Sequence, residues 1–119
     1  MNFHNHQFCS DIANLVNSEL KERRLAVRDL AKRVAGPLGL TPSTIGTYIH
    51  ELRKGWIIYA HGPTNTIRIR QHEKLAAILF VLGVPDEHPV ISALKSQDET
   101  FQYPPQNRDV YEVIPKPAE

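Results

Sequence analysis

The sequence predicts a mainly α-helical domain with a small β-hairpin. Apolar residues recur at three- and four-residue spacing before residue 55 and again after residue 70, as in helices that bury one face. Between them, residues 56–60 are rich in aromatic and β-branched side chains, and residues 66–70 alternate between apolar and polar, as two short strands do. With 119 residues, of which 41% are hydrophobic and 23% charged, the chain is expected to bury a single core.

Two helices are expected first, over residues 10–24 with Ser10 as the cap, and over about residues 26–35. Residues 36–38 would then lengthen the turn, because Pro37 disrupts a helix and disfavours helical geometry in its predecessor. An ungapped alternative keeps these residues in the last helical turn. The residues expected to face the core are Ile12, Leu15, Val16, Leu20, Val27, Leu30, Ala31 and Val34.

A third helix has the clearest start. Thr41 can accept an N-cap hydrogen bond, and Pro42 takes the first helical position, where its missing N–H costs nothing. One face is apolar and carries Ile45, Tyr48, Ile49 and Leu52. The opposite face is polar and carries Ser43, Thr47, His50 and Lys54. Hydrogen-bonding and cationic groups on one helix face suit the major groove of DNA.

The segment LGLTPSTIGTYIHELRKGWI resembles the turn and second helix of helix-turn-helix proteins. Gly39 and Leu40 match the glycine and the hydrophobe of that turn. Ile45 and Tyr48 match the buried positions of the second helix, and the small residue usual in the first helix falls on Ala35 when no gap is allowed.

The following residues resemble two subfamilies. ELRKGWIIYAHGPTNTIRIR is similar to the ending and β-wing of winged-helix regulators of the GntR and MarR groups, whereas KLAAILFVLGVP resembles the closing helix of the all-helical phage-repressor (Cro-like) family. That second family's usual glutamate and glycine are poorly matched by Ile49 and Glu51. We favour the winged form, covering about residues 10–84, over the all-helical bundle.

The resemblance implies a sequence-specific double-stranded DNA-binding protein, and most directly a dimeric transcriptional regulator. The residues expected to read bases are Ser43, Thr44, Thr47 and His50. The residues expected to hold phosphates or act from the wing are Thr41, Arg53, Lys54, Arg68 and Arg70. Gly46, inside this helix, marks either a close backbone approach or a tolerated cost.

The charge distribution favours the same interpretation. The net charge is +1, yet residues 1–70 hold ten basic and five acidic residues, whereas residues 71–119 hold four and eight. A positive surface supplies the sequence-independent part of DNA affinity. The alternative is an ordinary solvated helix face, formed by Lys21, Arg23, Arg24, Arg28, Lys32 and Arg33.

A helix over residues 71–82 is apolar on nearly every side from Leu75 onward. It is either central to the core or buries a face against a partner, and the resemblance to regulators favours a homodimer. The expected dimer interface is Leu75, Ile78, Leu79, Phe80 and Leu82. The alternative function is a protein-interaction module that docks a partner through this helix and binds no DNA.

The domain is expected to span residues 10–95, after a flexible N-terminus of residues 1–9. A short helix over residues 88–94 would close it. Residues 96–119 form a proline-rich acidic segment that is expected to be extended or disordered, with an edge strand or docking peptide over residues 109–114 as the alternative.

Enzyme chemistry is not expected. His4, His6 and Cys9 match no zinc spacing, and neither a nucleophile–base pair nor a phosphate loop is visible, so no metal or cofactor is predicted. The single cysteine excludes an intramolecular disulfide. No signal peptide or membrane-spanning run is found, which favours a cytoplasmic protein, of prokaryotic or phage origin by the resemblance.

Overall fold

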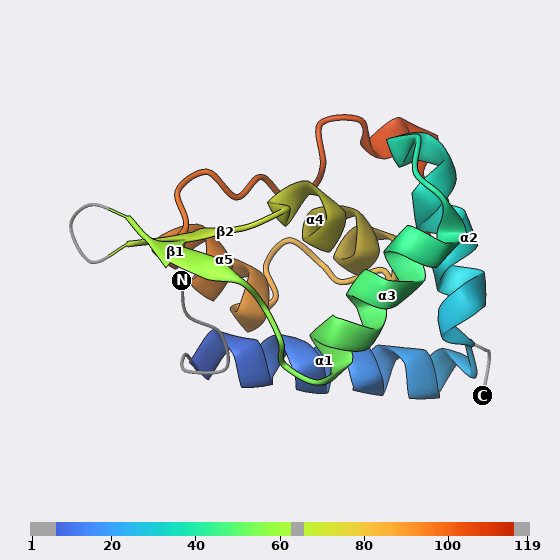
Figure 1. Cartoon of the computed structure of the whole chain (residues 1–119), viewed down its shortest axis with the longest axis horizontal. Coiled ribbons are helices and arrows are strands. Elements are labelled where there is room, and N and C mark those ends of the chain that lie inside the picture. The colour runs from blue at the N-terminus through green and yellow to red at the C-terminus, as the bar shows by residue number, and fades with distance from the viewer. Residues whose placement is uncertain (1–6, 63–65, 116–119) are drawn as a thin grey trace.

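The computed structural model describes residues 7–62 and 66–115, and these form a mainly helical fold with one antiparallel hairpin (Figure 1). The elements are α1 (Gln7–Arg23), α2 (Val27–Leu38), α3 (Pro42–Arg53), β1 (Tyr59–His61), β2 (Ile67–Ile69), α4 (His72–Val81), α5 (Pro89–Gln97) and the short 3-10 helix η1 (Arg108–Val110). The predicted mainly helical fold with a small hairpin is confirmed. Within these residues, no helix has the length and apolar character needed to cross a membrane.

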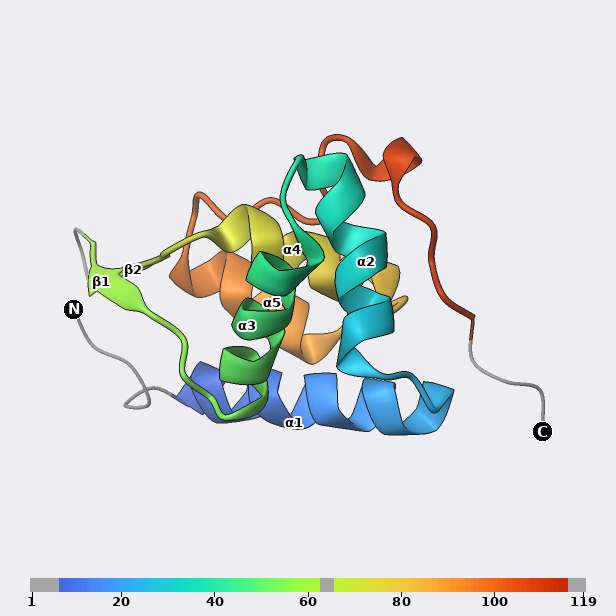
Figure 2. The same cartoon turned by 45° about the vertical axis from the view of Figure 1, so that its right-hand side comes forward.

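The helices form two layers on α1. Figures 1 and 2 show α1 along the base with α2 and α3 standing on it, and Figure 2 shows α4 and α5 behind α3. The hairpin projects from the side away from α2, and the C-terminal segment returns past α4 to the far end of α2. Packing joins α3 to both α1 and α2, and α4 to α2. This arrangement leaves α3 on the outside of the molecule, between the hairpin and α2.

The start of α1 differs from the prediction. The helix begins at Gln7, so Ser10 lies inside it and does not cap it. Phe8 and Cys9 are 2% and 1% exposed, and the Phe8 ring contacts Tyr59 of β1 with 5.3 Å between ring centroids. The predicted flexible segment 1–9 is therefore wrong for residues 7–9, because a contact with a strand fifty residues away stabilises the extra helical turn.

The end of α2 follows the ungapped register instead of the favoured one. The helix continues through Pro37 to Leu38, and Gly39 adopts a left-handed conformation with φ of 68°. The N–H groups of Gly39 and Leu40 donate to the carbonyls of Gly36 and Ala35, both at 3.0 Å. Pro37 has no N–H to donate to the Arg33 carbonyl, but Gly36 has no Cβ to clash with the proline ring, which eases the helical geometry of the residue before proline.

The hairpin has a defined register and two distinct faces. Tyr59 pairs with Ile69, and Ala60 pairs with Arg68. Tyr59, Ile67 and Ile69 are buried, whereas Arg68 is exposed, so the alternation predicted for the second strand is observed. The strands are shorter than predicted. Residues 63–65 of the predicted turn lie outside the described residues.

A buried carboxylate fastens the hairpin to the C-terminal segment. Asp98 is completely buried, and its side chain accepts hydrogen bonds from the Ile69 amide at 2.8 Å and the Thr100 amide at 2.9 Å. The Thr100 hydroxyl donates a third hydrogen bond, at 2.5 Å. A buried carboxylate needs such donors to offset its lost hydration.

The predicted loose tail is the main correction to the fold. Phe101, Tyr103, Tyr111 and Ile114 are buried in the core. The Ile114 amide donates to the Val81 carbonyl of α4 at 2.8 Å. Residues 109–114 thus pack against the chain's own core and form no strand, and the domain extends well beyond residue 95.

The predicted dimer interface is wrong in its residues. Leu75, Ile78, Leu79 and Leu82 are completely buried within the single chain. Phe80 is half-buried, and its ring centroid lies 6.4 Å from those of both Tyr103 and Tyr111. Helix α4 is therefore the central helix of the core, the first of the two alternatives. Its apolar residues are covered within the chain, and the C-terminal segment supplies part of that cover through Tyr103 and Tyr111.

Candidate nucleic-acid interface

Helix α3 is held firmly by its inner face and its ends. Ile45, Ile49 and Leu52 are completely buried, as predicted, whereas Tyr48 of the same predicted face is half-buried. At the N-terminus, the Thr41 hydroxyl accepts a hydrogen bond from the Thr44 amide at 3.2 Å, which confirms the predicted cap. Pro42 occupies the first turn. These contacts fix the direction in which the outer face of α3 points.

The four predicted base-reading residues are all exposed, and they are Ser43, Thr44, Thr47 and His50. Two of their hydroxyls have partners on the helix itself: Thr47 Oγ1 donates to the Ser43 carbonyl at 3.1 Å, and Thr44 Oγ1 lies 2.9 Å from Thr41 Oγ1. A hydroxyl rotates at little cost and keeps a further acceptor site, so both remain able to bond an external group.

The predicted phosphate contacts at the end of α3 also have roles within the chain. Arg53 Nε donates to Asn17 Oδ1 at 2.7 Å, and the Arg53 carbonyl accepts from Asn17 Nδ2 at 3.1 Å. This pair joins α3 to α1. The Lys54 ammonium lies 4.6 Å from the ring centroid of Trp56, whose side chain is 46% exposed. Both cations are exposed, so both can still approach a phosphate.

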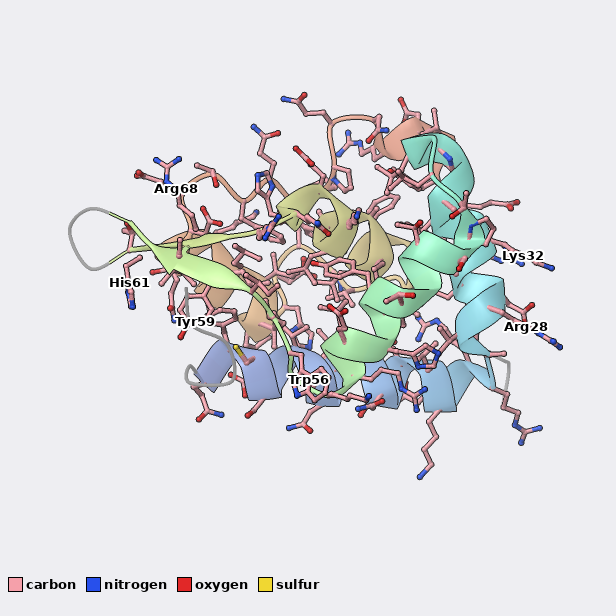
Figure 3. All side chains as sticks on the ribbon, in the orientation of Figure 1. Arg28, Lys32, Trp56, Tyr59, His61 and Arg68 are labelled. Atoms are coloured by element: carbon pink, nitrogen blue, oxygen red, sulfur yellow. The ribbon has the colours of Figure 1, made fainter. Side chains whose placement is uncertain are left out.

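The structure separates the two predicted arginines of the hairpin. Arg68 lies on the outer face of β2, on the projecting hairpin (Figure 3). Arg70 follows β2, donates its amide to the Ile58 carbonyl at 2.9 Å, and lines the same cleft as Ser43 and Thr47. Arg70 is therefore grouped with the base-reading residues, whereas Arg68 lies apart from them.

Most of the basic residues of the first half are exposed, with one exception. Arg23 is 9% exposed, forms an ion pair with Glu19, and donates Nε to the Ile114 carbonyl at 3.0 Å. The other nine basic residues before residue 71 are exposed. Figure 3 shows Arg28 and Lys32 on the outer side of α2, at the opposite end of the molecule from Arg68. The positive charge therefore spans the molecule and does not form a single cluster.

Sequence reasoning missed a cleft beside α3. It has a volume of about 520 Å³ and is lined in part by Tyr48, Glu51, Trp56 and Lys74. The Tyr48 hydroxyl is buried, and burial together with the neighbouring Glu51 carboxylate raises its pKa. The three-residue spacing of Tyr48 and Glu51 places them on neighbouring turns of one helix, but only the folded chain brings Lys74 and Arg70 to the same place.

The described residues contain no group of three or more histidine, cysteine, aspartate or glutamate side chains able to hold a metal ion. Cys9 is buried in the core, whereas His4 and His6 lie outside the described residues.

No protein-family model, curated protein or solved structure matches the chain.

Proposed function

We propose that the chain is a double-stranded DNA-binding protein of the winged helix-turn-helix type, acting as a transcriptional regulator. The observation that carries this proposal is the exposed polar row on α3, formed by Ser43, Thr47 and His50. These residues are spaced by four and three positions, so they follow one side of a helix whose other side is completely buried. Such a row on the outer face of a helix that is fixed by its buried face suits the major groove.

Two features of the surroundings support the proposal. The connection between α2 and α3 consists of residues 39–41, a length typical of a helix-turn-helix. The hairpin follows α3 at once and carries Arg68 outward, where a wing would meet the phosphate backbone or the minor groove.

The contacts are proposed to divide by type. Base edges would be read by Ser43, Thr44, Thr47 and His50, and phosphates would be held by Thr41, Arg53, Lys54, Arg68 and Arg70. Dimerisation through α4 is not part of the proposal, because that helix is the centre of the core.

The proposal is tested by selecting bound sites from random duplexes and then measuring affinity by fluorescence anisotropy across a series of salt concentrations. We expect enrichment of a short sequence, together with affinity that falls steeply with salt because bound phosphates release counterions. Affinity that does not change with salt, or a selection that enriches no sequence, would contradict sequence-specific DNA binding.

A further inference from the structure

The cleft beside α3 combines three kinds of chemistry in one concavity. Its lining includes the aromatic rings of Tyr48 and Trp56, the carboxylate of Glu51, and the cationic side chains of Arg70 and Lys74. The two cations come from the residue after β2 and from the first turn of α4, so they lie near the positive end of that helix's dipole. The cleft therefore offers an anion site next to aromatic surface.

One residue that lines this cleft, Tyr48, has a buried polar atom without a hydrogen-bond partner among the described residues. The Tyr48 hydroxyl is buried and makes no hydrogen bond within the described residues. The Lys74 ammonium lies 5.8 Å from the centroid of the Tyr48 ring and donates to Gln71 Oε1 at 2.9 Å. An unpartnered buried hydroxyl costs free energy, which a ligand that bonds to it would recover. The lysine stem is flexible, so its ammonium can move from Gln71 to a ligand in the cleft.

We propose that this cleft binds a nucleoside monophosphate. Arg70 and Lys74 would hold the phosphate, since a guanidinium fork and an ammonium both suit its oxygens. Trp56 would contact the flat base. The Glu51 carboxylate would accept hydrogen bonds from base N–H groups, of which guanine has two kinds side by side. The volume of about 520 Å³ lies within the range of small-molecule sites.

The ligand would lie on the face of α3 that is proposed to read DNA. Ser43, Thr44 and Thr47 line this cleft as well. If the proposed function holds, the nucleotide and duplex DNA therefore compete for one surface. The cleft itself does not depend on that function and is tested without DNA.

The test uses the full chain and guanosine monophosphate as the probe. Trp56 is the single tryptophan and lines the cleft, so its fluorescence reports occupancy directly. We expect a saturable change in emission, with guanosine and inorganic phosphate each binding more weakly. Arg70→Gln should weaken binding about tenfold. Arg68→Gln removes the same charge two residues earlier, outside the cleft, and should leave the affinity for guanosine monophosphate unchanged.

A second variant tests the hydroxyl. Tyr48→Phe keeps the ring and removes only the unpartnered group, so the protein should melt at the same or a higher temperature while its affinity for guanosine monophosphate falls about threefold. Absence of saturable binding, or equal affinity in the Arg70→Gln variant and the wild type, would overturn the site. Equal losses in Arg68→Gln and Arg70→Gln would also overturn it, because they would show diffuse charge attraction.

Titration with the selected duplex separates the two proposals. Nucleotide binding without duplex binding would reject the DNA-binding function and leave the cleft assignment standing. Duplex binding without nucleotide binding would reject the nucleotide site and leave the DNA-binding function standing. When both bind, guanosine monophosphate should lower the duplex affinity of the wild type much more than that of the Arg70→Gln variant.

Discussion

Two buried polar side chains illustrate opposite situations at the scale of single residues. Asp98 is completely buried and accepts hydrogen bonds from Ile69 and from Thr100. The buried Tyr48 hydroxyl has no partner among the described residues. Because each unmade bond costs free energy, the satisfied Asp98 carboxylate contributes to the stability of the fold, whereas the unsatisfied Tyr48 hydroxyl lowers it.

Replacing Asp98 with alanine is expected to lower the free energy of unfolding by about 3 kcal/mol, because the amides of Ile69 and Thr100 lose their acceptor in a buried place. Asp98→Asn retains one acceptor oxygen and should cost about half as much. Urea denaturation measures both. Asp109→Ala, an exposed carboxylate on η1, is the matched control and should change stability by less than about 0.5 kcal/mol.

The base-reading assignment is tested at Thr47 and His50. Alanine at either position should cost about 1–3 kcal/mol on the selected duplex and little on random DNA, because a lost base contact removes discrimination and not general attraction. Anisotropy titrations on both duplexes measure the difference. Ser92→Ala, on the exposed face of α5, should change neither affinity. Equal losses on the two duplexes would show that α3 does not read bases.

Among the elements, two glycines differ in whether their position would accept a side chain. A Cβ added to Gly46 in α3 would lie 4.0 Å from the Ala31 Cβ of α2, an ordinary contact. Gly83 has φ of 76°, and an added Cβ would lie 3.0 Å from Arg23 Nη2. The first glycine is therefore tolerated without being required by the packing of α2 on α3, whereas the second is required by the backbone.

Gly46→Ala is expected to raise the free energy of unfolding by about 1 kcal/mol, since alanine favours a helix and the added methyl fits. Gly83→Ala should lower it by about 1–2 kcal/mol, because the left-handed conformation strains any residue with a Cβ. Thermal denaturation of the two variants measures whether each substitution raises or lowers the stability of the protein. A destabilised Gly46→Ala variant would mean that α2 and α3 pack more closely than the structure shows.

The hairpin is expected to contribute charge without reading sequence. Arg68→Ala should weaken binding to every duplex and flatten the slope of log affinity against log salt by about one unit, the value for one lost phosphate contact. The control is Lys95→Ala, which removes an exposed positive charge on α5. An unchanged slope in the Arg68 variant would mean that the hairpin does not touch DNA.

At the scale of the whole molecule, the acidic second half of the sequence packs against the basic first half. Glu112 lies 3.5 Å from Arg33 of α2, and the Ile114 carbonyl accepts from Arg23 of α1. The C-terminal segment therefore contacts basic residues of both α1 and α2. The C-terminal segment also covers Phe80, which gives α4 its central position.

Phe80→Glu is expected to unfold the domain, because a charge would be placed between the rings of Tyr103 and Tyr111. Circular dichroism and size-exclusion chromatography measure the outcome. Val110→Glu, at a side chain 58% exposed on η1, should remain folded. A folded, functional Phe80→Glu variant of reduced oligomeric size would instead restore α4 as an interface.

The elements whose signals are local could be predicted from the sequence. The Thr41 cap with Pro42, the apolar stripe of α3 and the alternation of β2 all follow from side-chain spacing and capping chemistry, and the structure confirms them. The polar row on α3 was equally predictable, because the side opposite a buried stripe must face outward.

Features that depend on contacts between distant segments could be seen only in the folded chain. The extra turn of α1 depends on the contact between Phe8 and Tyr59. The burial of α4 depends on Tyr103 and Tyr111, which cover Phe80. The cleft beside α3 depends on Arg70, which the hairpin brings to α3. Local patterns record how apolar a segment is, but not which part of the chain covers it. A polar, proline-rich segment is predicted to be unstructured when the sequence does not show what its few aromatic residues pack against. In the folded chain, the aromatic residues of this segment pack into the core.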